Sequence, residues 1–291
     1  MLLALAALAS SLAGWQLAAV HESSIPSSVL RAAAHVRIAV VDTGADLSIP
    51  ELAARRPIAY DTRTHTTDVQ DASGHGTFVA SVAAAFGGEA RLILVKAGSS
   101  SGAFTDQSEA DGIRYAIRHG ARIVNLSIGG PTTSRIERAA VRFAVDSGAL
   151  VVTVAGNDHG MGNPVEYPAA LVKPVGSNGS GGTGLVVAAS DGRERASFSG
   201  SGSWISLAAP GVGVYGALRG GGHGYGNGTS FAAPQVSGAA ALVWAADPSL
   251  TAQDVARILE RSSSGHGRWT PGLGYGVIDV AAAVRAALAL R

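Results

Sequence analysis

The strongest constraint on the fold is a series of apolar, β-branched runs that recur along the chain with helix-like segments between them. Each run is continuously apolar rather than alternating, which is typical of strands covered on both faces. Strand and helix in alternation predict a doubly wound α/β fold, a mainly parallel sheet with helices on both faces. The predicted strands are 36–42 (VRIAVVD), 91–96 (RLILVK), 121–127 (ARIVNLS), 149–156 (ALVVTVAG) and 185–190 (LVVAAS).

The segments between these runs carry signals for the starts and ends of helices. DQSE from Asp106 and SRIE from Ser134 have the pattern of capping boxes. Gly120 and Gly148 follow the predicted helices as stop signals. These signals support the alternation of strands and helices.

The carboxyl ends of the predicted strands indicate where a site would lie. In doubly wound sheets, active sites lie beyond these ends. Asp42, Ser127 and Asn157 all fall at that edge. We therefore expect a functional site there.

Composition narrows the class of protein. The 291 residues could form one large domain or two modest ones, and no linker divides them. Charged residues make up 15%, well under the roughly 25% usual in soluble domains, which indicates a compact, buried sheet. A formal net charge of +1 without a Lys/Arg block predicts no nucleic-acid partner. The lack of cysteine excludes disulfides and thiolate metal sites, and it fits both the cytosol and a bacterial exoprotein.

The start of the chain, MLLALAALASSLAG, is similar to the apolar core of a signal peptide, although no Lys or Arg precedes it. The apolar run of about 14 residues is shorter than the roughly 20 needed to cross a bilayer. The sequence therefore predicts no membrane span, and export is an expectation.

Several other patterns predict no ligand. GSGGTG (179–184) has dinucleotide-binding spacing, but it precedes a strand instead of opening a helix, so we expect a flexible loop. RGGGHGYGNG (219–228) lacks the Gly-Lys-Ser/Thr ending of a phosphate-binding loop. No histidine has metal-ligand spacing, so no metal site is assigned. Seven histidines are expected at the surface or in loops: His21, His35, His65, His119, His159, His223 and His266.

The stretch VVDTGAD (40–46) places Asp42 at the end of the first predicted strand. Two peptide-cleaving chemistries use such a segment. In an aspartic protease, Asp-Thr-Gly supplies one of two carboxylates that share a proton. In a Ser-His-Asp protease, the aspartate orients a histidine. A strand end at which Asp42 caps a turn is a third interpretation, and this stretch alone does not decide between them.

Two later stretches add a histidine and a serine. SGHGTFVAS (73–81) places His75 between two glycines just ahead of an apolar helix of small residues. GNGTSFAAPQVSGAAALVWAA (226–246) places Ser230 at the start of a helix that is apolar on almost every face and hence buried. Capping by Thr229 or Ser230 would explain polar residues at this position. A developing oxyanion would also be stabilised there, because a helix N-terminus exposes N–H groups and a partial positive charge.

Together, VVDTGAD, GHGTFVAS and GTSFAAP resemble the three motifs of the subtilases, the subtilisin-like serine proteases, in that family's order. The resemblance extends from about Val36 to the C-terminus. It implies a serine endopeptidase in which Asp42, His75 and Ser230 form the catalytic triad and an acyl-enzyme intermediate is formed. An aspartic protease would need a second active Asp-Thr/Ser-Gly, and the sequence has only imperfect triplets such as SDG.

Two further stretches extend the resemblance to the reacting peptide. VTVAGNDHG (152–160) is similar to the family segment that carries the oxyanion-hole asparagine, which implies this role for Asn157. NLSIGGP (125–131) is similar to the substrate-binding segment. It implies that Ser127, Ile128 and Gly129 pair with the peptide backbone as an added strand.

The stretch NPVEYPAA (163–170) resembles the floor of the pocket for the residue before the scissile bond, which implies that Glu166 lies there. A carboxylate in that pocket predicts a preference for Lys or Arg. If Glu166 turns out to solvent, the pocket is lined by 127–129 and by Ala155, Gly156 and Asn157, and it favours apolar side chains. The sequence leaves both interpretations open.

Two departures from the family pattern concern calcium and maturation. The chain runs directly from AAAFGGEA to RLILVK, without the longer loop that carries calcium in many members. No cofactor is required for the predicted chemistry, and calcium is not assignable. Only 41 residues precede Asp42, too few for the usual prosegment plus the mature start. Either a cleaved prosegment lies outside this chain or this member folds without one.

These observations predict a catalytic domain over 36–291, preceded by an N-terminal segment over 1–35 that is signal-like or begins the mature domain. The expected partners are protein or peptide substrates, and the expected location is secreted or in the cell envelope. The alternative function is a catalytically weak binding protein on the same fold, which the intact triad positions disfavour.

Overall fold

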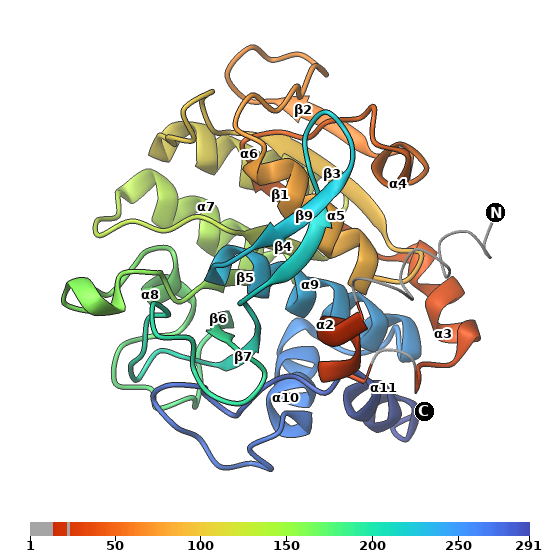
Figure 1. The fold of residues 1–291 in the computed structure, drawn as a ribbon, viewed down its shortest axis with the longest axis vertical. Coiled ribbons are helices and arrows are strands. Elements are labelled where there is room, and N and C mark those ends of the chain that lie inside the picture. The colour runs from red at the N-terminus through yellow and green to blue at the C-terminus, as the bar shows by residue number, and fades with distance from the viewer. Residues whose placement is uncertain (1–13, 22–23) are drawn as a thin grey trace.

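The computed structural model describes residues 14–21 and 24–291, so the signal-like stretch up to residue 13 lies outside the described residues. Seven strands form one parallel sheet in the order β2-β3-β1-β4-β5-β6-β7, with β2 at one end and β7 at the other (Figure 1). They are β1 (Arg37–Asp42), β2 (Ile58–Asp61), β3 (Arg91–Lys96), β4 (Ile123–Leu126), β5 (Leu150–Val154), β6 (Gly184–Ser190) and β7 (Leu207–Pro210).

Helices cover both faces of this sheet, and strand β1 shows how. Ile38 and Val40 belong to a hydrophobic cluster with α5 (His75–Phe86) and α9 (Thr229–Ala246). Ala39 and Val41 point to the opposite face and belong to a second cluster. That cluster includes residues of α6 (Asp106–Arg118) and α7 (Arg135–Asp146). The predicted doubly wound fold is confirmed.

The remaining elements surround these two layers. Val29 and Ala33, which precede β1, belong to the cluster around α9. In the described part of the chain, every helix is too short or too polar to cross a membrane. The other elements are α2 (Gly14–Ala19), α3 (Ser27–Ala32), η2 (Ala33–His35), α4 (Pro50–Ala53), η3 (His159–Met161), α8 (Ala169–Val172), α10 (Ala252–Ser262), α11 (Val280–Leu288) and an antiparallel hairpin of β8 (Val214–Ala217) and β9 (His223–Gly226).

The predicted strands are all present, with ends that shift by one or two residues. Strands β2 and β7 were not predicted, because each has only four residues and neither forms a long β-branched run. The glycine-rich segment 219–228 contains a further unpredicted strand, β9, which pairs with β8.

The helix signals are mostly confirmed. Ser134 caps α7 by accepting a hydrogen bond from the N–H of Glu137, and the glycines after α6 and α7 both have φ of 80°. The prediction that the capping box of α6 begins at Asp106 is wrong. The N-cap is Thr105, one residue earlier, and its capping partner is Ser108. A hydroxyl at Thr105 was available directly before the predicted start, and it takes the capping position.

Candidate active site

Asp42 ends β1 at the carboxyl edge of the sheet, where a site was expected. Its side chain is buried. Oδ1 accepts a hydrogen bond from the backbone N–H of Thr43 at 2.7 Å and lies 2.7 Å from Nδ1 of His75. Within the described residues, Oδ2 has no hydrogen-bond partner. A carboxylate in this position fixes the imidazole ring and favours its protonated form.

His75 is the first residue of α5, and Gly74 before it has φ of 88°. Gly76 allows a close approach, because a Cβ there would lie 2.3 Å from the carbonyl oxygen of Gly44 and 3.1 Å from Oδ1 of Asp42. The glycines beside His75 therefore let the start of α5 pack directly against the end of β1. Gly44 of the Asp-Thr-Gly stretch is part of this contact.

Asp71 is a buried residue that the sequence patterns do not single out. Oδ1 accepts hydrogen bonds from Oγ1 of Thr43 (2.8 Å) and from the N–H groups of Ser73 and Gly74. Oδ2 accepts from the N–H (2.8 Å) and Oγ1 (2.7 Å) of Thr77. Burial raises the pKa of Asp71, but these hydrogen bonds outweigh burial and hold its pKa below the ordinary 3.8. As an anion, Asp71 fixes the loop that leads into α5.

The charges around His75 change its acidity. Burial lowers the pKa of the imidazole, but the charge of Asp42, the hydrogen bond to Asp42 and the charge of Asp71 outweigh burial. The net effect is a pKa raised above the ordinary value of 6.5. The neutral ring that can accept a proton is therefore reached at a higher pH than for an isolated histidine.

Ser230 lies in the first turn of α9, which begins at Thr229. The interpretation that Thr229 or Ser230 caps the helix is wrong, because the N-cap residue is Gly228, which has no side chain. Oγ of Ser230 donates to the carbonyl of Ser127 (3.4 Å), and Oγ of Ser127 donates to the carbonyl of Ser230 (2.8 Å). Ser127 and His75 line the same cleft, and the ring of Phe231 lies 5.7 Å from the imidazole, centre to centre. Ser230 therefore lies next to Ser127, which lines the same cleft as His75.

Asn157 follows β5 and contacts the start of α9. Its Oδ1 accepts hydrogen bonds from the backbone N–H (3.0 Å) and Oγ1 (3.1 Å) of Thr229. These two bonds fix the orientation of the side-chain amide. Its Nδ2 remains available as a donor, because no residue of the described chain accepts a hydrogen bond from it. Asn157 can therefore donate a hydrogen bond to a group bound beside Ser230.

A cleft of about 280 Å³ passes between His75, the loop before α6 and the segment after β4. The described chain provides no hydrogen-bond partner for the backbone groups of Ile128 and Gly129, whereas Gly130 exchanges two hydrogen bonds with Tyr167. An extended peptide can therefore add alongside this segment. The sequence patterns did not predict the wall that faces this segment, which includes Gly102 and Phe104 of the loop before α6. The lining residues are Thr43, Ser73, His75, Gly102, Phe104, Ser127, Ile128 and Gly129.

Glu166 is buried, 8% exposed, and its carboxylate lies between two glycines. A Cβ on Gly129 would lie 1.8 Å from Oε2, and a Cβ on Gly156 would lie 2.2 Å from Oε1. Burial, followed by the charge of Asp158, raises the pKa of Glu166 above its ordinary value. The carboxylate therefore occupies the space between the segment 127–129 and the segment around Gly156, and it does not turn out to solvent.

The other titratable groups form no cluster of three or more possible metal ligands within residues 14–21 and 24–291. Several of the histidines that were assigned to the surface have local partners. Nε2 of His223 lies 2.7 Å from Oε1 of Glu51, and Nδ1 of His21 lies 3.0 Å from Oδ2 of Asp279. Calcium is still not assignable to this chain.

Comparison with known proteins agrees with this geometry. The sequence model of the subtilase family matches residues 33–276. Subtilisin E of Bacillus subtilis is 36% identical over 262 residues, 86% of this chain and 66% of the relative. The subtilisin of Bacillus pumilus is 35% identical, over 86% of this chain and 91% of the relative. A solved protease structure from Pseudoalteromonas arctica superposes with a TM-score of 0.76 at 26% identity, covering 91% of this chain and 94% of that one.

The chain belongs to the subtilase family. Its fold class is the one predicted from the alternation of strands and helices, and its enzyme class, serine endopeptidase, is the one predicted from the three motifs. In this subtilase, the segments that carry the motifs meet at the carboxyl edge of the sheet, from β1, α5 and α9.

The raised pKa of His75 predicts the pH dependence of peptide hydrolysis. Only neutral imidazole accepts a proton, so the rate should rise through an ionisation above the ordinary histidine value of 6.5. NMR titration of the ring in a Ser230→Ala variant measures the same ionisation directly. Asp42→Asn removes the largest favourable charge and should lower this pKa. A midpoint below 6.5 in the unmodified chain, or no shift in the Asn variant, would contradict the structure.

Proposed function

We propose that Ser230 is the nucleophile that cleaves peptide bonds, that His75 is the general base and then the general acid, and that Asp42 orients the imidazole. The observation that carries this proposal is the 2.7 Å contact between His75 and the buried Asp42, beside a cleft whose lining residue Ser127 contacts Ser230. His75 takes the hydroxyl proton as Oγ attacks the carbonyl carbon, and it returns that proton to the leaving amine. Water then hydrolyses the acyl-enzyme.

The oxyanion of the tetrahedral intermediate is held, in this proposal, by Nδ2 of Asn157 and the backbone N–H of Ser230. Two features support it. Thr229 fixes the amide of Asn157 before the substrate arrives. The N–H of Ser230 belongs to the first turn of α9, where N–H groups have no intrahelical partner and the helix carries a partial positive charge.

The proposed substrate is a protein or peptide with Lys or Arg before the scissile bond. In this proposal the Lys or Arg side chain of the substrate enters between Gly129 and Gly156, where the carboxylate of Glu166 lies. No cation of the described chain forms an ion pair with Glu166. The cation of a Lys or Arg side chain would compensate the Glu166 carboxylate for the water that it loses on burial, whereas an apolar side chain would not.

The proposed setting follows from the sequence. We place the enzyme outside the cytoplasm, secreted or in the cell envelope, since its start is similar to a signal peptide. It acts on protein or peptide partners without nucleic acid, and a prosegment that assists folding would be cleaved during maturation. The triad and the oxyanion hole need no cofactor. The alternative, a binding protein without useful turnover, has the same fold but predicts an unreactive Ser230.

The triad predicts losses that do not add. Ser230→Ala, His75→Ala and Asp42→Ala should each nearly abolish hydrolysis of a peptide substrate, because the three residues act as one unit. The double variant Ser230→Ala/His75→Ala should be about as slow as Ser230→Ala alone. Steady-state rates and melting temperatures of all variants check this. Multiplicative losses in well-folded double variants would exclude the triad.

Asn157→Ala should lower kcat by about 10²- to 10³-fold with KM nearly unchanged, because its hydrogen bond forms mainly in the transition state. Full kinetics on one peptide substrate measures both constants. Asn157→Asp, which replaces the donor by an acceptor of the same size, is the matched control and should lose at least as much. A rise in KM alone would make Asn157 a binding or turn residue.

Glu166→Gln should reduce the preference for Lys over Phe before the scissile bond by roughly 5- to 150-fold. Peptides that differ only in Lys, Phe or Leu at that position measure the ratio of kcat/KM values. Glu194→Gln removes the same charge from an exposed loop after β6 and serves as control. If the Glu166 variant keeps the ratio of the unmodified enzyme, Glu166 does not select the substrate.

A further inference from the structure

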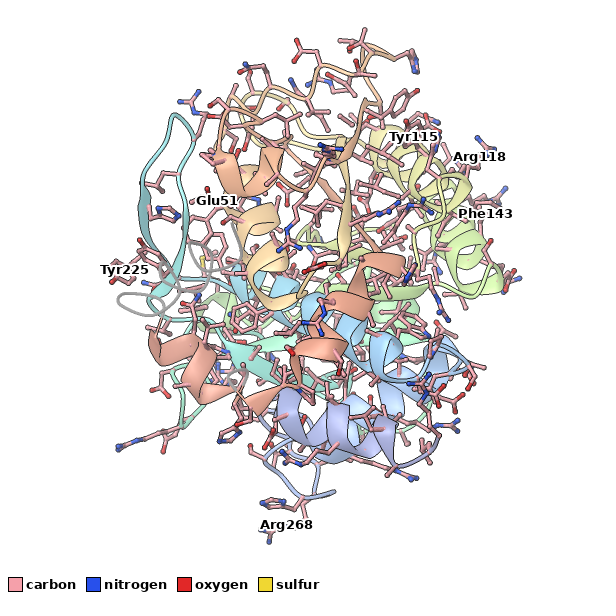
Figure 2. The ribbon with its side chains drawn as sticks, turned by 90° about the vertical axis from the view of Figure 1, so that its right-hand side faces the viewer. Glu51, Tyr115, Arg118, Phe143, Tyr225 and Arg268 are labelled. Atoms are coloured by element: carbon pink, nitrogen blue, oxygen red, sulfur yellow. The ribbon has the colours of Figure 1, made fainter. Side chains whose placement is uncertain are left out.

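Helix α9 carries Ser230 in its first turn and is buried along most of its length. Figure 2 shows α9 in pale blue across the middle of the molecule, while the labelled side chains of Tyr115, Arg118 and Phe143 lie toward the outside. In an α-helix, each carbonyl accepts a hydrogen bond from the N–H group four residues later. Four residues after Ser230 stands Pro234, inside α9, and proline has no N–H. The carbonyl of Ser230 therefore lacks its usual donor within the helix.

Ser127 supplies a donor to this carbonyl from outside the helix. Its hydroxyl, in the segment after β4, donates to the carbonyl oxygen of Ser230 at 2.8 Å. The hydroxyl of Ser230 lies 3.4 Å from the carbonyl oxygen of Ser127, which is too long for a strong O–H···O bond. The first turn of α9 is therefore tied to the end of β4 through its backbone, while the hydroxyl of Ser230 is held only weakly.

Two further side chains fix the direction of the Ser127 hydroxyl. Nδ2 of Asn125 donates to Oγ of Ser127 at 3.0 Å, and Oγ of Ser237 donates to Oδ1 of Asn125 at 2.8 Å. An amide nitrogen only donates, so Ser127 must accept from Asn125. The single proton of the Ser127 hydroxyl is then left for the carbonyl of Ser230. The donors form one chain that runs from Ser237 through Asn125 and Ser127 to Ser230.

Asn125 and Ser237 are polar residues at positions that face a hydrophobic layer. Asn125 lies in β4 two residues after Ile123, so it points to the same face of the sheet, toward the hydrophobic cluster that contains α9. Ser237 follows Ser230 by about two turns and lies on the same side of α9. Asn125 and Ser237 are both 0% exposed. Burial of an amide and a hydroxyl is costly unless both are hydrogen bonded, and the chain that bonds them ends at the nucleophile.

We propose that Asn125 and Ser237 are positioning residues for the nucleophile. Acting through Ser127, they provide the donor that Pro234 removes from the helix, and they hold the first turn of α9 against the end of β4. That turn carries the hydroxyl and the backbone N–H of Ser230, which the proposed function uses for attack and for the oxyanion. The inference rests on that proposed function, and neither Asn125 nor Ser237 takes part in the chemistry itself.

Ser237→Ala and Asn125→Leu test this inference, because each breaks the chain with little change in volume. Each should lower kcat by roughly 10-fold, since a small displacement of a reacting group is costly, and should leave KM within about 2-fold. The pH midpoint of the rate should not move, because Asp42 and His75 keep their contact. Ser237→Thr retains the hydroxyl and should keep kcat within about 2-fold of the unmodified enzyme. Steady-state kinetics on one peptide substrate measures all of these values.

Combined variants test whether the two residues act through one hydroxyl. Asn125→Leu/Ser237→Ala should be about as slow as Asn125→Leu alone, because the chain is already broken. Pro234→Ala gives the helix an N–H of its own for the carbonyl of Ser230. In that background, Ser237→Ala should lower kcat by less than about 2-fold.

Ser206→Ala is the matched control for the loss of a buried serine hydroxyl. Ser206 is also 0% exposed, and its hydroxyl accepts from the backbone N–H of Val186 in β6, outside the chain that ends at Ser230. This variant should lower the melting temperature, as Ser237→Ala does, and should leave kcat in place. All rates are measured well below the lowest melting temperature, so that unfolding does not contribute to them.

The outcomes separate the positioning role from the proposed function. If the unmodified enzyme hydrolyses the peptide and both single variants keep its kcat, the positioning role is overturned and the endopeptidase function stands. The same holds if Ser206→Ala loses as much kcat as Ser237→Ala, or if the loss in Ser237→Ala is undiminished in the Pro234→Ala background. If the unmodified enzyme hydrolyses no peptide, the proposed function fails and the positioning role fails with it.

Discussion

The contact between Asp42 and His75 is the interaction on which the rest of the site depends. It joins the end of β1 to the first residue of α5. Asp71 binds the loop before α5 and also Thr43, so one buried carboxylate holds both sides of the contact. The geometry of the imidazole is therefore set by the fold before any substrate binds, which is what preorganised catalysis requires.

Several polar groups around the cleft are not satisfied by the described chain. Glu166 is a buried carboxylate without a cationic partner among the described residues, and Nδ2 of Asn157 and the backbone of Ile128 have no hydrogen-bond partner there. Such groups reduce stability in the free protein. A bound peptide that supplies the missing partners is therefore favoured. The same groups that select the peptide lower the free energy of unfolding of the free protein.

Short sequence patterns were sufficient to predict most of the fold and the class of reaction. The continuous apolar runs predicted five of the seven strands, and three short motifs predicted Asp42, His75 and Ser230. What could not be predicted depends on side chains that meet only in space. Asp71 belongs to no motif, although Asp71 and Thr77 stand on either side of the Gly-His-Gly stretch.

The central claim is that this arrangement makes Ser230 a nucleophile, and covalent labelling with a fluorophosphonate tests it most directly. The account predicts one adduct, located on Ser230 by mass spectrometry, whose rate of formation rises with pH through the ionisation of His75 and falls sharply in His75→Ala. Denatured protein should not react. Labelling at another residue, or labelling of Ser230 at the same rate when His75 is absent, would contradict the account.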